Sequence, residues 1–266
     1  MKIFSLYNIK GGVGKTTTAV NLAYLSAQDG ARTLIWDLDP QGSTSFYFCV
    51  KPEVKGGTKE LLSNHPDIKP MLRMTGFPNL DLLPADISYR HMESELEDQS
   101  KPMLALQKLL KPLQKHYDHL IIDCPPGIGL VAENIFQLSN TLVVPLIPTP
   151  LSLRAYNRLV QFLVKRRSNR LHVLPFFNMI NEHKPIHRAV TRNVFSGHPI
   201  FMQSIIPESN LIEAMGIKRA PIFSYARESQ EATAYRNLWN EIKQREARRT
   251  AATGKGKDLK TEPTAS

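Results

Sequence analysis

The chain has 266 residues, 42% hydrophobic and 22% charged, which suits a globular protein with one large α/β domain or two small ones. Its net charge of +10 favours polyanions, such as nucleic acid or an anionic membrane surface, as partners. Cys49 and Cys124 fit no metal or redox spacing and predict reduced thiols in a cytosolic protein. The most apolar stretch, 141–153, is too short and proline-rich to span a membrane.

Apolar, β-rich segments alternate with helical patterns along the chain. Strands are predicted at 2–9, 32–39, 79–86, 119–127, 140–148, 171–180 and 201–207. Helices are predicted at 16–30, 104–117 (with Pro112 inside), 151–168, 208–216 and 228–247. This alternation predicts a single doubly wound, mostly parallel sheet with helices on both faces. In such sheets ligands bind beyond the carboxyl ends of the strands.

The end of the chain has a different composition. Apolar periodicity stops after the last predicted helix, and the segment 248–266 is polar, basic and rich in Gly, Thr and Pro. We therefore predict a folded domain over 1–247 and a basic, disordered tail over 248–266.

The segment "KGGVGKTT", 10–17, lies between the first predicted strand and the first predicted helix. Its glycines let backbone amides approach phosphate oxygens. Lys15 is placed to reach the β- and γ-phosphates of a nucleotide, and the Thr16 hydroxyl is placed to hold Mg²⁺. The usual phosphate loop has a glycine six residues before its lysine, where this chain has Ile9, followed by a second lysine, Lys10.

With that lysine, the motif resembles the deviant Walker A box of the ParA/MinD-type ATPases, a branch of the P-loop NTPases. The resemblance implies ATP and Mg²⁺ as ligands and slow, partner-stimulated ATP hydrolysis. It implies that Lys10 reaches across a dimer to the nucleotide of the other subunit, much like an arginine finger. The nucleotide-binding residues that it implies in the loop are Lys10, Gly11, Gly12, Val13, Gly14, Lys15, Thr16 and Thr17.

Two further segments carry carboxylates at strand ends. In "WDLDPQGSTS", 36–45, Asp37 and Asp39 point the same way from the end of a strand. The resemblance places Asp37 near the Mg²⁺ and gives Asp39 the role of orienting or activating the attacking water. In "LIIDCPPG", 120–127, Asp123 ends an apolar strand. The resemblance implies that this is a Walker B strand whose carboxylate binds Mg²⁺ through water, and that residues 125–127 are a second switch that senses the γ-phosphate.

The later part of the chain gives softer indications. The resemblance places adenine near two strand ends, where "FNMIN" offers Asn178, or alternatively Asn181, and "IIPES" offers Pro207. ParA-type proteins also bind duplex DNA nonspecifically when ATP makes them dimerise. The candidate DNA contacts are basic residues in 183–192 and 216–227, namely Arg188, Arg192, Lys218, Arg219 and Arg227. This chain has Leu211 at a position where the family commonly has an arginine.

The resemblance thus favours a cytoplasmic, nucleoid-associated ParA-like ATPase that segregates or positions DNA or another cargo. It would act as an ATP-dependent homodimer, with a ParB-like or other adaptor stimulating hydrolysis. One alternative is a MinD-like protein at the membrane, although the segment after Arg248 lacks an apolar stripe for stable anchoring. Another is a regulatory ATPase of the cellulose-synthesis or flagellum-placement type. The cargo and the adaptor are not specified by these residues.

Overall fold

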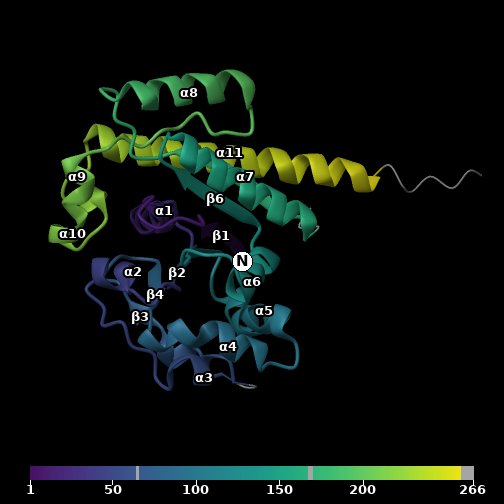
Figure 1. Cartoon of the computed structure of the whole chain (residues 1–266). Helices are drawn as coiled ribbons and strands as arrows, with labels where there is room; N and C mark the ends of the chain where they lie inside the picture. The colour runs from purple at the N-terminus through teal and green to yellow at the C-terminus, as the bar shows by residue number, and fades with distance from the viewer. Residues whose placement is uncertain (64–65, 167–169, 259–266) are drawn as a thin grey trace, which may run out of the picture.

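A computed structural model describes residues 1–63, 66–166 and 170–258. Within these residues, seven strands form one sheet in the order β3-β4-β2-β5-β1-β6-β7 (Figure 1). The neighbouring strands are parallel, except for the antiparallel pair β3–β4. The predicted doubly wound, mostly parallel sheet is therefore confirmed. The strands are β1 (Lys2–Leu6), β2 (Thr33–Asp37), β3 (Arg73–Met74), β4 (Leu80–Leu83), β5 (His119–Asp123), β6 (Thr141–Leu146) and β7 (His172–Phe177).

Helices cover both faces of the sheet because successive strand residues point to opposite sides. In β5, Leu120 and Ile122 join one apolar cluster, whereas Ile121 joins the other. The first cluster includes side chains of α5 (Ala105–Leu110), α6 (Leu130–Leu138) and α7 (Pro150–Lys165). The second includes those of α1 (Lys15–Gln28) and α11 (Gln230–Asp258).

Shorter elements complete the described chain. The α-helices are α2 (Ser43–Tyr47), α3 (Gly57–Leu61), α4 (Met92–Glu97), α8 (Pro185–Gly197), α9 (Asn210–Glu213) and α10 (Met215–Lys218). The 3₁₀ turns are η1 (Lys69–Met71), η2 (Ile87–His91), η3 (Pro102–Leu104), η4 (Lys111–Lys115) and η5 (Ile222–Ser224). No helix in the described ranges is long and apolar enough to cross a membrane.

The prediction of a strand at 201–207 is wrong. This segment runs beside β7, but only an isolated bridge joins Ile180 to Pro207. Met202 N–H donates to the Pro175 carbonyl and Ile206 N–H to the Phe177 carbonyl, so the five residues 202–206 lie beside only the three residues 175–177 of β7. The amides of Gln203 and Ser204 turn away and donate to the Glu241 carboxylate on α11. That carboxylate satisfies the amides outside a regular ladder.

Several helix boundaries also differ from the prediction. The helix predicted at 104–117 stops as α5 at Leu110, because Pro112 cannot donate the next helical hydrogen bond, and continues as η4. The helix predicted at 208–216 is two short helices, α9 and α10. Helix α11 passes the predicted domain end at 247 and continues to Asp258 (Figure 1). Residues 259–266 of the predicted tail lie outside the described residues.

Candidate nucleotide and metal site

The glycine loop joins the carboxyl end of β1 to the first turn of α1. Gly12 and Gly14 have φ angles of 70° and 80°, in the left-handed region that favours glycine. Gly14 is the N-cap of α1, so the free amides of the first helical turn open into the loop. A Cβ on Gly14 would lie 2.1 Å from Asn178 Nδ2. Both the backbone angle and the space therefore require glycine at position 14.

Lys15 is a buried cation in this loop, with 7% of its surface exposed. Its Nζ donates to the Lys10 carbonyl oxygen at 3.4 Å, and it makes no ion pair within the described residues. A buried ammonium group with one long hydrogen bond lacks the compensation that burial of a charge requires. The first turn of α1 and Lys15 together make a site suited to an anion.

Asp37 and Asp123 lie side by side at the carboxyl ends of β2 and β5, where they are direct partners in the parallel register. Both are fully buried. Asp123 Oδ2 accepts hydrogen bonds from the hydroxyls of Thr16 at 2.7 Å and Thr44 at 2.9 Å. Asp37 Oδ2 accepts from the amide and the hydroxyl of Ser45, both at 2.7 Å. The Oδ1 atom of each carboxylate has no partner.

Burial raises the pKa of both carboxyls above the ordinary range, and the neighbouring charge of Asp123 raises that of Asp37 further. Two buried carboxylates with unpartnered oxygens, beside the Thr16 hydroxyl, suit a hard divalent cation such as Mg²⁺. Among the described residues, no group of three or more His, Cys, Asp and Glu side chains forms a separate metal site. The observed oxygen donors therefore fit a cation that shares its coordination with phosphate oxygens.

The remaining candidates in this region take distinct positions. Gly11 is exposed, Val13 is buried, and Thr17 Oγ1 donates to the Gly14 carbonyl at 3.2 Å. Asp39 is half-buried, and its Oδ1 accepts from Gln41 N–H at 3.0 Å. Lys10 is half-buried; its amide donates to Asn8 Oδ1 at 2.9 Å, and its side chain forms no ion pair in the described ranges.

The candidate base segments lie next to each other and next to the loop. Ile180 N–H donates to the Ile206 carbonyl, and Glu208 N–H donates to the Ile180 carbonyl, which joins 178–181 to 205–208. Asn178 is buried; its Nδ2 donates to the Val13 carbonyl at 2.8 Å, whereas its Oδ1 is unpartnered. Asn181 Nδ2 donates to Glu208. The Asn178 amide thus supports the phosphate loop and keeps one acceptor oxygen available.

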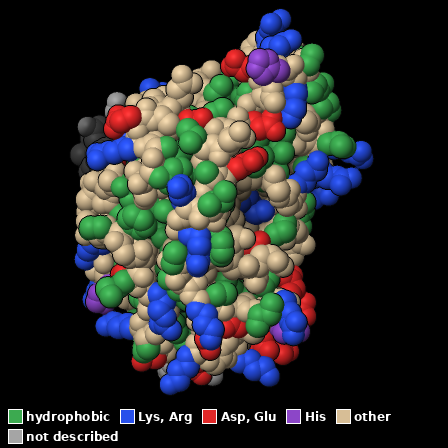
Figure 2. Space-filling model, turned by 90° about the vertical axis from the view of Figure 1, so that its left-hand side faces the viewer, with side chains coloured by type: hydrophobic (Ala, Val, Ile, Leu, Met, Phe, Trp, Pro, Cys, Tyr) green, Lys and Arg blue, Asp and Glu red, His purple; other side chains and the backbone are tan. Residues whose placement is uncertain are grey.

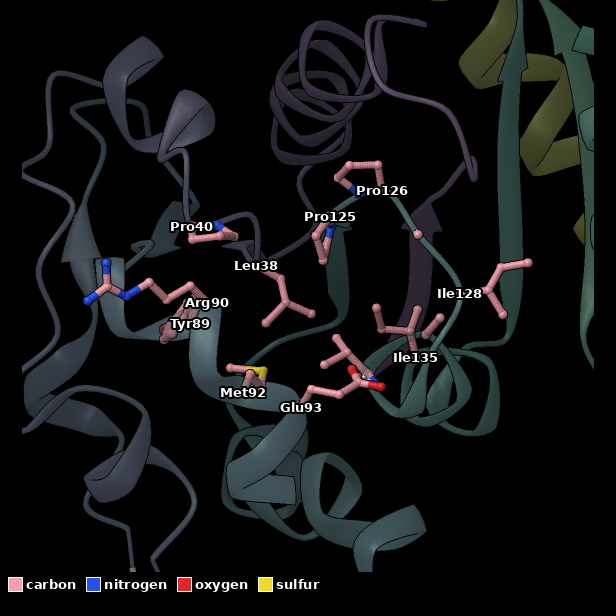
Figure 3. A pocket seen from close by; sticks show the side chains of 14 residues that line it. Leu38, Pro40, Tyr89, Arg90, Met92, Glu93, Pro125, Pro126, Ile128 and Ile135 are labelled. Carbon is pink, nitrogen blue, oxygen red and sulfur yellow. Dashed lines mark hydrogen bonds between the residues drawn. The ribbon is translucent and has the colours of Figure 1, made fainter. Parts of the chain in front are cut away.

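A hollow lies between the segment after β2 and the segment after β5. It has a volume of about 270 Å³ and is bordered by Leu38 and Pro40 on one side and by 125–129 on the other (Figure 3). Tyr7 OH donates to the Gly127 carbonyl at 2.5 Å, and the Glu93 carboxylate accepts the amides of Leu130 and Val131. The loop after β5 is therefore held from two sides.

Four residues of these networks were missed by sequence reasoning: Tyr7, Thr44, Ser45 and Glu93. Thr44 and Ser45 directly follow the "DLDPQG" box, so proximity to that motif is the signal that could have identified them. Glu93 lies far from every motif, and its contact with α6 depends on tertiary packing alone.

The candidate DNA contacts come from several elements. Arg188 and Arg192 lie on α8, Lys218 ends α10, and Arg227 precedes α11, where it pairs with Glu228 at 3.9 Å. Arg219 instead packs against Phe46, with its guanidinium 4.5 Å from the ring centre. Figure 2 views the side of the molecule that carries α2, α9 and α10. Its Lys and Arg side chains are spread among apolar ones and are not gathered into one patch.

A protein-family model described as "AAA domain" matches residues 1–173. The chain is 32% identical to "Chromosome-partitioning ATPase Soj" of Treponema pallidum, over 93% of this chain and 99% of that protein. It is 39% identical to "Sporulation initiation inhibitor protein Soj" of Bacillus subtilis, in a match that covers 54% of this chain and 57% of that protein.

Solved structures share the fold over nearly the same length. A putative plasmid partition protein from Borrelia burgdorferi, bound to AMPPNP, superposes with a TM-score of 0.79 at 21% identity and covers 92% of this chain and 99% of that one. Cobyrinic acid a,c-diamide synthase from Mycobacterium smegmatis, with bound ADP and magnesium, gives a TM-score of 0.76 at 25% identity and covers 90% and 93%. One fold thus carries proteins of different named activities.

Proposed function

Since the chain belongs to the ParA-like family of P-loop ATPases, we propose that it hydrolyses ATP as a switch that controls its own dimerisation and its binding to DNA. The observation that carries this proposal is the buried Lys15, unpaired beside the glycine loop, next to two buried carboxylates with unpartnered oxygens. A nucleotide triphosphate with Mg²⁺ supplies the negative and positive charges that these groups lack.

Each residue has a separate part in the proposed reaction. Lys15 and the first amides of α1 bind the β- and γ-phosphates. Thr16 would hold Mg²⁺ directly and Asp37 and Asp123 would hold it through water, and the bound ion would stabilise charge on the phosphates. Asp39, two residues beyond Asp37 and half-buried, orients the attacking water. Asn178 and Pro207 contribute to the base pocket.

Lys10 acts in trans in this proposal. Its half-buried side chain forms no ion pair among the described residues. In an ATP-bound dimer, it reaches the phosphates held by the second copy and stabilises charge there as an arginine finger does. Each active site then contains residues of both copies. ATP hydrolysis, stimulated by a partner protein, returns the chain to its monomeric form.

The dimer binds duplex DNA through its basic residues, without reading sequence. A net charge of +10 per chain attracts phosphate, and pairing two copies doubles the number of contacts. Nucleoid association and release by hydrolysis would let the protein segregate DNA or position another cargo. The named relatives in chromosome partitioning support this use.

The test is nucleotide-dependent DNA binding by Asp39→Ala, a variant that should bind ATP but hydrolyse it slowly. We expect its affinity for random-sequence duplex DNA to rise with Mg²⁺–ATP and to fall steeply with salt. Lys15→Ala is the control that should not respond to ATP. If Asp39→Ala binds nucleotide yet gains no DNA affinity, the DNA part of the proposal fails.

A further inference from the structure

Helix α2 contacts the candidate metal site on one side and an exposed basic segment on the other. Thr44 donates to Asp123, and Ser45 donates to Asp37. The next residue, Phe46, has 47% of its surface exposed and packs against Arg219. The helix has only five residues, so a displacement at Thr44 is carried directly to Phe46.

The contact between Phe46 and Arg219 has several components. The Arg219 guanidinium lies 4.5 Å from the Phe46 ring centre, and its Nε donates to the Phe46 carbonyl at 3.0 Å. The Cys49 Sγ lies 3.9 Å from the Arg219 carbonyl oxygen. These contacts join the end of α10 to the end of α2, although the two segments are about 170 residues apart in sequence.

The backbone on both sides of this junction is strained. Cys49 has a φ of 57° and Arg219 a φ of 48°, in a region that residues with side chains seldom adopt. Such conformations persist only where the surroundings hold them, and they concentrate at switch regions. Both residues follow the end of a short helix, where Cys49 N–H donates to the Phe46 carbonyl and Arg219 N–H to the Met215 carbonyl, and the contacts between the two segments add to these hydrogen bonds.

We propose that Arg219 is a positioning residue through which the metal site controls the basic surface at α10. This inference rests on the proposed function. Without nucleotide, Phe46 holds the Arg219 guanidinium. Mg²⁺ bound at the free Oδ1 of Asp123 would turn this carboxylate away from the Thr44 hydroxyl that donates to Oδ2, so that α2 would shift and the Phe46 contact would open. Arg219 then joins Lys218, which is exposed, in binding DNA phosphates.

The chain contains its own probe of this opening. Cys49 is exposed and lies at the junction, whereas Cys124 is buried. The rate at which a disulfide reagent such as DTNB reacts with Cys49 therefore reports the junction in the absence of DNA. We expect Mg²⁺–AMPPNP to raise this rate about two- to fivefold, the size of an exposed cation–π contact.

Two variants test the role of the contact. Phe46→Leu keeps an apolar side chain but removes the aromatic ring, and we expect its Cys49 to react at the faster rate without nucleotide. Lys218→Ala is the matched control: it removes the neighbouring cation and should leave the Cys49 rate unchanged in both states. If nucleotide binds but does not change the wild-type Cys49 rate, or if Phe46→Leu without nucleotide reacts as slowly as wild type, the coupling is refuted.

The affinity for duplex DNA provides a second test of the proposal. Without nucleotide, Phe46→Leu should bind duplex DNA about two- to fivefold tighter than wild type, because it removes the ring contact that holds the Arg219 guanidinium, while the hydrogen bond to the carbonyl of residue 46 remains. Arg219→Ala and Lys218→Ala should each reduce the salt dependence of binding in the ATP state by about one phosphate contact. Unchanged affinity of Phe46→Leu would overturn the proposed release of Arg219. A wild-type protein that never binds DNA would overturn the proposed function instead, while the Cys49 rates would still decide whether α2 is coupled to α10.

Discussion

The electrostatics of the candidate site are dominated by two adjacent carboxyls. Asp37 and Asp123 are partners in the sheet register, fully buried, and each keeps an oxygen without a hydrogen bond. Their raised pKa values mean that the folded protein without metal binds protons that the unfolded chain has lost. Stability of the metal-free protein should therefore fall as the pH rises above the ordinary carboxyl pKa of about 4.

Asp37→Asn should stabilise the metal-free protein. The amide can still accept from Ser45 through its oxygen, but it removes a buried charge beside Asp123. We expect the free energy of unfolding to rise by roughly 2 kcal/mol at pH 8, with a smaller gain near pH 5. Urea unfolding with EDTA at both pH values measures this, with the exposed Asp98→Asn as control. A loss of stability at pH 8 would contradict the assigned direction.

Asn178→Ala separates two roles of one side chain. The amide supports the loop through the Val13 carbonyl, while its free oxygen faces no protein partner. We expect the affinity for ATP and for inorganic tripolyphosphate to fall, each by a factor of about ten, because loss of the loop hydrogen bond affects both ligands. Calorimetric titration measures the two affinities. A loss confined to ATP would show that Asn178 contacts the base without supporting the loop.

At the scale of elements, β1, β2, β4, β5, β6 and β7 all lie inside their predicted segments, and each predicted segment runs past its strand at the carboxyl end. The carboxyl ends of β1, β2 and β5 bring together the glycine loop, Asp37 and Asp123. The segment 201–207 is also apolar, but two of its backbone amides donate hydrogen bonds to the Glu241 carboxylate on α11 and not to a neighbouring strand. That contact joins residues far apart in sequence, so local pattern could not reveal it. The same holds for the placement of Thr44 by α2 and of Glu93 by α4.

Helix α11 is tied to the sheet by a buried carboxylate. Glu246 has 1% of its surface exposed and contacts Lys2 Nζ at 3.0 Å and His172 Nδ1 at 2.5 Å. These residues begin β1 and β7, so one side chain joins the helix to two strands. Its hydrogen bonds to His172 and Lys2 outweigh the effect of burial and lower the Glu246 pKa to about 2. The stability it contributes is present above the ordinary pKa and is lost as the pH falls toward 2.

Glu246→Gln should destabilise the protein by roughly 2 kcal/mol at pH 7, because Lys2 loses its charged partner while His172 loses its strongest acceptor. The difference from wild type should shrink as the pH is lowered toward 2. Glu228→Gln is the matched control, since that side chain is 88% exposed and its ion pair with Arg227 is 3.9 Å long. Thermal and urea unfolding of the two variants give the comparison; equal stabilities would mean that Glu246 does not secure α11.

At the scale of the whole molecule, the positive charge is not gathered into one patch on the face with α2 and α10. Figure 2 shows Lys and Arg side chains interleaved with apolar ones on this face. On this face a single copy therefore offers few phosphate contacts at one place, which favours weak and salt-sensitive binding. Composition predicts a polyanionic partner, but in the proposed dimer the arrangement of contacts depends on how two copies pair, which no pattern in one chain specifies.

Lys10 and Lys15 should fail in different ways when each is changed to alanine. Lys15 is buried in the loop, so Lys15→Ala should lower nucleotide affinity at least about tenfold. Lys10 forms no ion pair in the described part of its own chain, so Lys10→Ala should bind Mg²⁺–ATP within about twofold of wild type. It should nevertheless lose ATP-dependent dimerisation, since the charge that it supplies acts on the other copy's nucleotide. Titration calorimetry and sedimentation velocity separate the two effects, with the exposed Lys59→Ala as control. Equal losses of nucleotide affinity in both variants would mean that Lys10 binds the nucleotide of its own chain. The argument for an active site shared by two copies would then fail.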